Sequence, residues 1–273
     1  MADIRKDIGI LEDIFNGEAP YRDWTKIYPR TTEDIAKVLD IVDVRGLDVY
    51  SILSSSDIPF SLIEKRVKSI DTFDINPLTL RYYYLRKWML ENGLLDGKDL
   101  EYDVIQGIIN QKRIYINDDE KTSVKFWNIY IEKMNKYFFN LYNACLFNYV
   151  SERIACCYDD DLSYLVEHLS SHPLTFECRD LSLSGKHNKK YDLVYLSNIM
   201  DLNDKYRIGM IVKNLESLLN DGGQVICTNL VKHPYFDFFR EQREVFKEKF
   251  AYEELFRERV GSEDNVYYRY IKK

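Results

Sequence analysis

The sequence predicts an α/β protein of the Rossmann-like type, with a mostly parallel sheet flanked by helices. Three observations lead to this prediction. From residue 49 onward, short apolar runs alternate with helix-length segments, a spacing typical of right-handed βαβ units with parallel strands. Several of these runs end in small polar or acidic residues, at the strand ends where such sheets bind ligands. The last two runs, 250–259 and 266–271, are linked by Gly261 and Ser262 and are expected to pair as an antiparallel hairpin.

The other elements follow in order along the chain. The expected strands before the hairpin span residues 49–53, 69–73, 174–178, 191–196 and 224–229. The expected helices span residues 34–42, 58–67, 77–91, 162–169, 205–219 and 235–249. Pro59 and Pro77 fit this scheme because proline is tolerated in the first turn of a helix. The Asn-Asp-Gly-Gly run at 220–223 is expected to stop the helix before it.

Two segments are expected to lie outside this alternation. Residues 1–33 are predicted to form an N-terminal helical lead-in, followed by a sheet domain of residues 34–273. Residues 97–158 show a helical period, are rich in large aromatic side chains and contain no strand of the parallel type. We therefore expect a helical insertion there that caps the ligand crevice of the sheet domain.

The composition argues against several classes of function. The net charge is −7, whereas a surface that neutralises phosphates must be basic, so no nucleic-acid partner is expected. No run approaches the ~20 apolar residues of a membrane span, and the acidic N-terminal stretch is unlike a signal peptide. The five cysteines form no CxxC pair and the four histidines no Cys/His cluster, so no metal site is expected. A reduced cytoplasmic protein is predicted.

The turn after the first expected strand holds the first candidate site. Ser54, Ser55 and Ser56 occupy the place of a GxGxxG motif and are followed by Asp57. Their hydroxyls, with the amide groups of the helix start, suit a carboxylate such as that of the amino-acid end of S-adenosylmethionine. Asp57 suits the ammonium group of the same ligand. The alternative is an ordinary Ser/Asp N-cap of the next helix.

The second expected strand ends in Asp74, some 20 residues past the first turn, where an acid can hydrogen-bond the ribose hydroxyls of an adenosine. Ile75 and Asn76 follow and are included in the expected cofactor site. Asp74 alternatively forms a turn, since Asn76 and Pro77 begin the next helix.

Later strand ends supply further candidates. Asp180 follows the third strand, in the place of an acid that reaches the adenine amino group, or else it forms a turn. Ser197 and Asn198 end the fourth strand and are expected to face the cofactor and the substrate. Asp201 is the candidate general base or ligand of a substrate amine. Alternatively, Asp201 and Asn203 cap the helix that follows.

Three runs of the sequence resemble a known bacterial family. They are IYPRTTEDI at 27–35, the segment 54–86, and YDLVYLSNIMDL at 191–202. The family is related to the S-adenosylmethionine:diacylglycerol 3-amino-3-carboxypropyltransferases of betaine-lipid synthesis. The resemblance implies a class I methyltransferase-like Rossmann fold with S-adenosylmethionine as cofactor.

The resemblance rests on three motifs of that family. They are an SGD-type first turn, a DxNP end to the second strand and an LSN motif on a later strand. The matching residues here are Ser55, Ser56 and Asp57; Asp74, Asn76 and Pro77; and Leu196, Ser197 and Asn198. Ser56 departs from the family turn, which carries glycine at this position.

The function expected from these features is that of an S-adenosylmethionine-dependent transferase. The group transferred is methyl or 3-amino-3-carboxypropyl, and the acceptor is a small molecule or lipid-like. The alternative is a non-catalytic nucleoside-binding protein that acts as a sensor or interaction module, which Ser56 favours. An NAD(P)-dependent oxidoreductase shares the acid on the second strand, but a pyrophosphate needs the glycines that are absent here. No GxxxxGK[ST] motif is present, which excludes a P-loop enzyme.

Overall fold

A computed structural model describes the greater part of the chain outside its N-terminal and central segments. The described residues are 9, 31, 33–76, 79–91, 162–171, 174–183, 188–202, 204–231, 244–260 and 263–273. The expected insertion at 97–158 lies outside them, as does the expected lead-in at 1–33 apart from Gly9, Thr31 and Glu33.

The chain divides into two compact units. One comprises Met1–Thr32, Ser54–Asp57 and Asn76–Ser170, and the other Glu33–Leu53, Ile58–Ile75 and Ser171–Lys273. The first contains helix α4 (Thr79–Glu91) and nearly all of α8 (Ser163–Ser171). The second contains the sheet.

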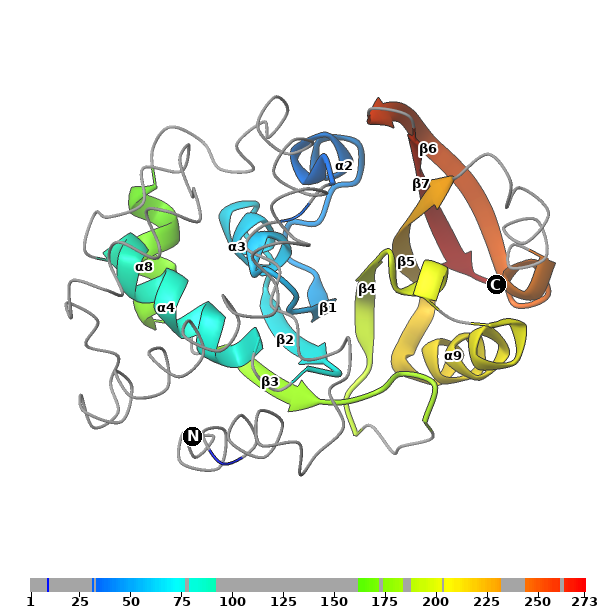
Figure 1. Ribbon diagram of the computed structural model, residues 1–273, viewed down its shortest axis with the longest axis horizontal. Coiled ribbons are helices and arrows are strands. Elements are labelled where there is room, and N and C mark those ends of the chain that lie inside the picture. Colours follow the sequence, from blue (N-terminus) through cyan, green and yellow to red (C-terminus); the bar gives the residue numbers. More distant parts are fainter. Residues whose placement is uncertain are drawn as a thin grey trace. The chain divides into compact units, whose positions relative to one another are not determined.

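The sheet has seven strands in the order β3-β2-β1-β4-β5-β7-β6 (Figure 1). Their bounds are β1 Asp48–Ile52, β2 Ser69–Asp74, β3 Thr175–Cys178, β4 Tyr191–Ser197, β5 Leu219–Val231, β6 Phe250–Val260 and β7 Glu263–Lys272. Strands β1 to β5 are parallel to their neighbours among themselves, whereas β7 is antiparallel to both β5 and β6. The predicted parallel sheet with an antiparallel C-terminal hairpin is therefore confirmed.

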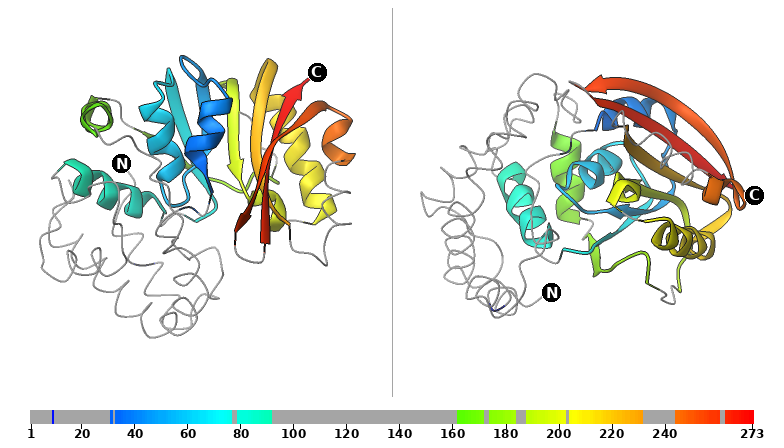
Figure 2. Two further views of the ribbon diagram at one scale, coloured as in Figure 1. Left: turned by 90° about the horizontal axis from the view of Figure 1, so that it is seen from above. Right: turned by 45° about the vertical axis from the view of Figure 1, so that its right-hand side comes forward.

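Helices cover both faces of the sheet (Figure 2). Helix α9 (Lys205–Leu218) lies on one face, and α2 (Ile35–Ile41) and α3 (Asp57–Glu64) lie on the other. A hydrophobic core lies on the α9 face, because alternate residues of the central strands point to it and meet the apolar stripe of the helix. That core includes Tyr50, Phe73, Val194, Leu196, Val225, Ile208, Ile211 and Leu215.

The start of β5 differs from the prediction. The strand begins at Leu219, directly after α9, and the Asn-Asp-Gly-Gly run lies inside it. Tyr191 pairs with Leu219 but Leu193 pairs with Gln224, so the intervening residues bulge out of the ladder. Gly222 has a φ of +73°, and a Cβ at Gly223 would lie 2.9 Å from the Asn220 carbonyl oxygen. These glycines permit the bulge. The helix ends directly before the run, as expected, but the strand begins at Leu219 and not at Gln224.

The structure also defines the start of α9 and part of the helix expected at 235–249. Asp204 is the N-cap of α9 and accepts a hydrogen bond from the Arg207 amide at 2.9 Å, so Asp201 and Asn203 are not its caps. Of the helix expected at 235–249, the described part is helical over 244–247.

Within the described ranges, none of the helices has the length and apolar character needed to cross a membrane.

Candidate functional site at the carboxyl edge of the sheet

The parallel strands β1 to β5 end at one edge of the sheet, and this edge contains the point where the strand order reverses. From β1 the chain proceeds outward to β2 and β3 on one side, and then returns to β4 and β5 on the other. Ligands of open α/β sheets bind outside the carboxyl ends of the strands at such a switch point. The residues that end β1 and β4 are therefore the first to consider, followed by those that end β2 and β3.

Asp74 is the last residue of β2 and is 6% exposed. It pairs in parallel register with Cys178 of β3, and its carbonyl oxygen accepts a hydrogen bond from the Arg179 amide at 2.8 Å. The main chain at Asp74 is thus fixed by the sheet. Ile75 follows with a side chain that is 44% exposed. The structure places Asp74 and Ile75 at the carboxyl edge, as the sequence predicts.

Asp180 follows β3 and takes part in a turn. Its Oδ1 accepts hydrogen bonds from the Ser182 amide at 2.8 Å and the Ser182 hydroxyl at 2.7 Å. Its Oδ2 lies 3.7 Å from a guanidinium nitrogen of Arg207. These contacts give Asp180 a turn-forming role, which is one of the two roles that the sequence allows for it.

Ser197 is the last residue of β4 and has a left-handed backbone, with φ of +57°. Its hydroxyl donates a short hydrogen bond to Glu33, whose other carboxylate oxygen accepts one from the Tyr195 hydroxyl at 3.4 Å. Asn198 follows and is partly buried. The next residues form a short 3-10 helix, Ile199–Leu202, which contains Asp201.

Glu33 lies at the candidate site, next to Ser197, and the sequence analysis does not single it out. It is only 7% exposed and lies directly before Asp34, the N-cap of α2, which accepts a hydrogen bond from the Lys37 amide at 3.0 Å. In the sequence, nothing distinguishes Glu33 from the other polar residues that precede the expected helix at 34–42. The one sequence feature that could have drawn attention to Glu33 is its position in the 27–35 run, which is part of the resemblance to the bacterial family.

Tyr267 of β7 extends the hydrogen-bonded cluster around Glu33. Its hydroxyl accepts from the Asp34 amide at 2.8 Å and donates to Glu258 of β6 at 2.5 Å. Burial raises the pKa of the Tyr267 phenol, and the nearby charge of Glu33 raises it further. The phenol therefore remains protonated and acts as a fixed donor.

The turn that follows β1 belongs to the other unit. Ser54 and Ser56 have left-handed backbones, with φ of +44° and +73°. Ser55 and Ser56 are buried, and the Ser56 hydroxyl makes no hydrogen bond to any residue in the described ranges. Ser56 thus adopts a left-handed conformation that glycine adopts at a lower cost.

Asp57, the first residue of α3, is held by a buried ion pair. Its Oδ1 lies 2.7 Å from Nη1 of Arg86 on α4. Its Oδ2 accepts from the Ser55 hydroxyl at 2.7 Å and the Thr31 amide at 2.6 Å. Arg86 was also missed in the sequence, because it is one basic residue among several on a predicted helix. In the same unit the carbonyl oxygen of Asn76 accepts from the Thr79 hydroxyl at 2.8 Å, at the start of α4.

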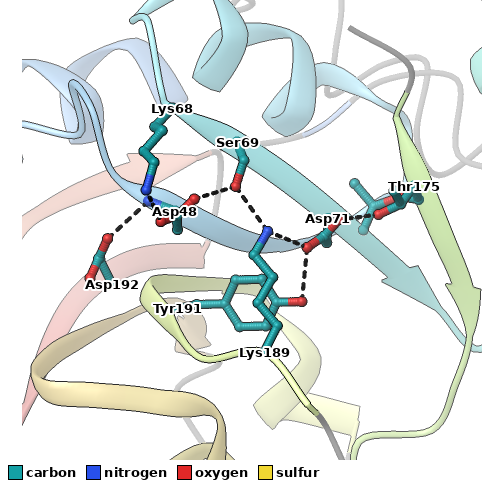
Figure 3. Close-up of polar contacts among 9 residues, drawn as sticks. Asp48, Lys68, Ser69, Asp71, Thr175, Lys189, Tyr191 and Asp192 are labelled. Carbon is teal, nitrogen blue, oxygen red and sulfur yellow. Dashed lines mark hydrogen bonds and ion pairs between the residues drawn. The ribbon is translucent and has the colours of Figure 1, made fainter.

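The opposite edge of the sheet carries a separate polar network (Figure 3). There Lys68 pairs with Asp48 at 2.7 Å and Lys189 with Asp71 at 2.7 Å. Asp71 also accepts from the Tyr191 hydroxyl at 3.0 Å. Because these residues lie near the amino ends of β1, β2 and β4, far along the strands from the switch point, we interpret them as structural ties between strands.

The part of the chain that the structure describes contains no group of three or more His, Cys, Asp or Glu residues that could hold a metal ion.

The fold and this edge define an α/β protein of the class I methyltransferase-like Rossmann type, because the antiparallel β7 is inserted between β5 and β6 of an otherwise parallel sheet. No model of a known protein family matches the chain, and no curated protein matches its sequence.

Several solved structures are similar to the chain. One is the N-methyltransferase NodS from Bradyrhizobium japonicum WM9 in complex with S-adenosyl-l-homocysteine, with 10% identity, 97% of each chain covered and a TM-score of 0.47. A TehB-like SAM-dependent methyltransferase from Corynebacterium glutamicum has 10% identity, coverage of 99% of this chain and 98% of that one, and a TM-score of 0.43. Because the identities and TM-scores are low, neither similarity shows that this chain binds the same ligand or has the same activity. The fold of this chain is assigned from its own strand order.

Proposed function

We propose that this protein is an S-adenosylmethionine-dependent transferase that moves a methyl or 3-amino-3-carboxypropyl group to a small-molecule or lipid-like acceptor. The observation that carries the proposal is the position of Asp74. It supplies a carboxylate at the end of β2, next to β1 and some 20 residues after the first turn, where an adenosine ribose is held in sheets of this kind.

The strand order favours S-adenosylmethionine over a dinucleotide. The dinucleotide-binding sheet has the order 3-2-1-4-5-6. Here β7 separates β5 from β6 and runs antiparallel to both. In addition, the turn after β1 presents serine hydroxyls and contains no glycine, which suits a carboxylate better than a pyrophosphate.

The remaining candidate residues have the following proposed roles. Asp74, with Ile75 and Asn76 after it, binds the ribose, and the loop of Asp180 lies against the adenine. Ser54, Ser55 and Ser56 bind the cofactor carboxylate through hydroxyl and amide groups. Ser197 and Asn198 contact the cofactor and the acceptor. The unpartnered hydroxyl of the buried Ser56, as judged among the described residues, supports a ligand at this turn.

The chemistry requires mainly positioning. The sulfonium of the cofactor activates the attached carbon, so an in-line attack by the acceptor forms the new bond as the carbon–sulfur bond breaks and sulfur keeps the electron pair. Residues of the carboxyl edge then need only align the acceptor and exclude water. The alignment accelerates the transfer through proximity and orientation. Asp201, on the 3-10 helix after β4, is proposed to accept the acceptor's proton.

Two further expectations belong to this proposal. We propose a cytoplasmic location, because the five cysteines form no CxxC pair and leave an odd count, which favours a reduced protein. We also propose an acceptor other than nucleic acid, because the net charge of −7 disfavours binding to phosphates.

Calorimetric titration with S-adenosylmethionine, S-adenosylhomocysteine and methylthioadenosine tests the cofactor. The native protein should bind all three, and Asp74→Asn should weaken each about tenfold or more because all share the ribose. Asp71→Asn is the matched control, since Asp71 lies on the same strand but contacts Lys189 and Tyr191 at the opposite edge. No binding of any of the three ligands to the native protein would contradict the proposal.

The sulfur-containing product then separates the two transfers. Methyl transfer leaves S-adenosylhomocysteine, and aminocarboxypropyl transfer leaves methylthioadenosine. Incubation with S-adenosylmethionine and cell extract, followed by mass spectrometry of the nucleosides, identifies which is released. Tight binding without either product would favour the nucleoside-binding sensor, for which Ser56 in place of glycine is the supporting observation.

A further inference from the structure

Strand β5 extends past the end of β4 at the carboxyl edge of the sheet (Figure 1). The last residue pair between the two strands is Ser197 with Cys227, whereas β5 continues to Val231. Beyond that pair, the described strand that pairs with β5 is β7, up to Asp264 opposite Val231. Thr228 is the first residue of this extension and therefore lies beside the end of β4, where the acceptor is proposed to bind.

The hydroxyl of Thr228 is a buried polar group whose hydrogen bonding the described residues do not satisfy. Thr228 is 0% exposed, and its Oγ1 makes no hydrogen bond to any residue in the described ranges. Thr72 of β2 differs, because it is 1% exposed and its hydroxyl donates to the Thr175 carbonyl oxygen at 2.6 Å. A buried hydroxyl without a partner costs free energy, and valine would fill the same space without that cost. At an edge where ligands bind, such a group points to a ligand that takes up its hydrogen bond.

The side chain of Thr228 shares one face of the sheet with other hydroxyl groups. Cys227 belongs to the core under α9, so Thr228, the next residue on the strand, faces the opposite side. Tyr267 of β7 lies directly opposite Thr228 and faces the same side. Tyr195 of β4 is also on this face, because it is in register with Ile226, two residues before Thr228. Both tyrosine hydroxyls donate to glutamates, whereas the Thr228 hydroxyl has no such acceptor among the described residues.

We infer that the Thr228 hydroxyl hydrogen-bonds a polar group of the acceptor, and that the acceptor is a polar small molecule rather than a lipid. This inference rests on the proposed function, because it presupposes a transferase whose acceptor binds at the end of β4. Strand β5 also contacts the 3-10 helix Ile199–Leu202, which contains the proposed base Asp201. The strand that carries Thr228 therefore adjoins both elements to which the acceptor is assigned.

The chemistry of the hydroxyl defines which acceptors fit. A hydroxyl has one donor and two acceptor positions, so it matches a hydroxyl, amine or carboxylate group. An alkyl chain at this position would leave the hydroxyl without a partner and retain the cost of its burial. Because protein atoms cover Thr228, binding requires a side-chain rotation at this residue or at a neighbour, a common change at binding surfaces.

The experiment uses S-adenosylmethionine labelled with ¹⁴C in the methyl or the carboxyl group, together with cell extract. The extract is separated into water-soluble small molecules and solvent-extracted lipids, and each fraction is offered to the native protein. Label should enter the water-soluble fraction. In Thr228→Val, the amount of this fraction needed for half-maximal labelling should rise about fivefold or more, because one hydrogen bond to the acceptor is lost. The affinity for S-adenosylhomocysteine, measured by calorimetry, should stay unchanged.

Two further variants serve as controls. Thr228→Ser keeps the hydroxyl and should require nearly the native amount of the water-soluble fraction. Thr72→Val removes a hydroxyl that is bonded within the sheet, so it should lower the melting temperature and leave half-maximal labelling unchanged. Thr228→Val should not lower the melting temperature, since its hydroxyl forms no hydrogen bond with the described residues.

Each other outcome has a definite meaning. Label that enters only the lipid fraction would overturn the polar acceptor and leave the proposed function intact. Unchanged half-maximal labelling in Thr228→Val, or a loss of affinity for S-adenosylhomocysteine, would overturn the role of Thr228 as an acceptor ligand. Failure of Thr228→Val to fold would show that the hydroxyl is a structural group and would overturn the inference as well. Absence of label from both fractions would contradict the proposed transferase function itself.

Discussion

The Asp57 carboxylate lies 2.7 Å from Nη1 of Arg86, and the two side chains are 7% and 1% exposed. The same Nη1 donates to the carbonyl oxygen of Ser55. Arg86 therefore holds the turn after β1 by two contacts, one with the main chain of Ser55 and one with the carboxylate of Asp57. Two charges withdrawn from water in this way contribute little as a pair relative to apolar residues. The loss of one partner is costly, because it leaves the other charge buried and uncompensated.

Arg86→Met should therefore lower the free energy of unfolding by about 3–5 kcal/mol. Lys65→Met is the control, because Lys65 forms an ion pair of 3.0 Å with Asp40 whose side chains are 32% and 68% exposed. Such surface pairs contribute about 1 kcal/mol or less. Urea denaturation followed by circular dichroism measures both. The double variant Asp57→Asn/Arg86→Met should recover part of the loss, and equal small effects of Arg86→Met and Lys65→Met would refute this account.

Ser56→Gly should stabilise the protein. A left-handed backbone costs a non-glycine residue about 1–2 kcal/mol, while glycine costs about 0.5–1 kcal/mol in chain entropy, so a net gain of about 0.5–1 kcal/mol is expected. The φ of +73° persists in the variant, and the lost hydroxyl makes no hydrogen bond with any described residue. Thermal unfolding measures the change. Ser61→Gly, inside α3, should destabilise instead by about 0.5 kcal/mol, and a loss in both variants would show that Ser56 is not strained.

The strands could be predicted because each one is recognisable from the residues of its own short segment. An apolar run of β1 or β4 that is buried on both faces, bounded by polar turns, identifies a parallel strand from the sequence alone. The start of β5 was not predictable in the same way. A glycine pair after a helix usually marks a stop, and only the pairing of Leu219 with Tyr191 makes the run a bulge within a strand.

The residues of the candidate site likewise divide into those that the local sequence predicts and those that it does not. Asp74 and Ser197 follow directly from strand ends, so their placement at the carboxyl edge could be predicted. Glu33 and Arg86 could not, because their roles depend on partners 164 and 29 residues away in the sequence. Neither residue is distinguished from an ordinary surface charge until the fold brings its partner within hydrogen-bonding distance.

Asp71 should make stability depend on pH. Burial raises the pKa of Asp71, but hydrogen bonds from Lys189, Thr175 and Tyr191 outweigh burial, and the pKa is lowered overall. A carboxyl group with a lowered folded-state pKa stabilises the fold above its unfolded pKa of about 3.9, and this contribution is lost as pH falls through the folded value. Asp71→Asn should thus be less stable than the native protein by about 1–2 kcal/mol at neutral pH.

The difference between native protein and Asp71→Asn should shrink as the pH falls below about 4. Urea denaturation at a series of pH values measures it. Lys190→Met serves as the control, since Lys190 is exposed and adjacent in sequence to Lys189. A difference that stays constant into the acid range would mean that the charge of Asp71 does not stabilise the network in Figure 3.

Cys178 should report directly on ligand binding at the carboxyl edge. It is exposed at the end of β3, opposite Asp74 in the strand register, and its thiol lies 3.6 Å from the Ile75 carbonyl oxygen. Cys227 is buried in the core under α9. Because reactivity requires an accessible thiolate, iodoacetamide should modify Cys178 in the native protein and Cys227 only after unfolding.

A ribose bound at Asp74 would cover this thiol, so saturating S-adenosylhomocysteine should slow the alkylation of Cys178 several-fold. Peptide mass spectrometry follows each cysteine separately. In Asp74→Asn, at the same ligand concentration, the protection should be lost because the ligand no longer binds tightly. Alkylation of Cys178 at an unchanged rate in the ligand-saturated native protein would place the nucleoside away from β2 and β3, and Asp74 would then be a turn former rather than a ribose ligand.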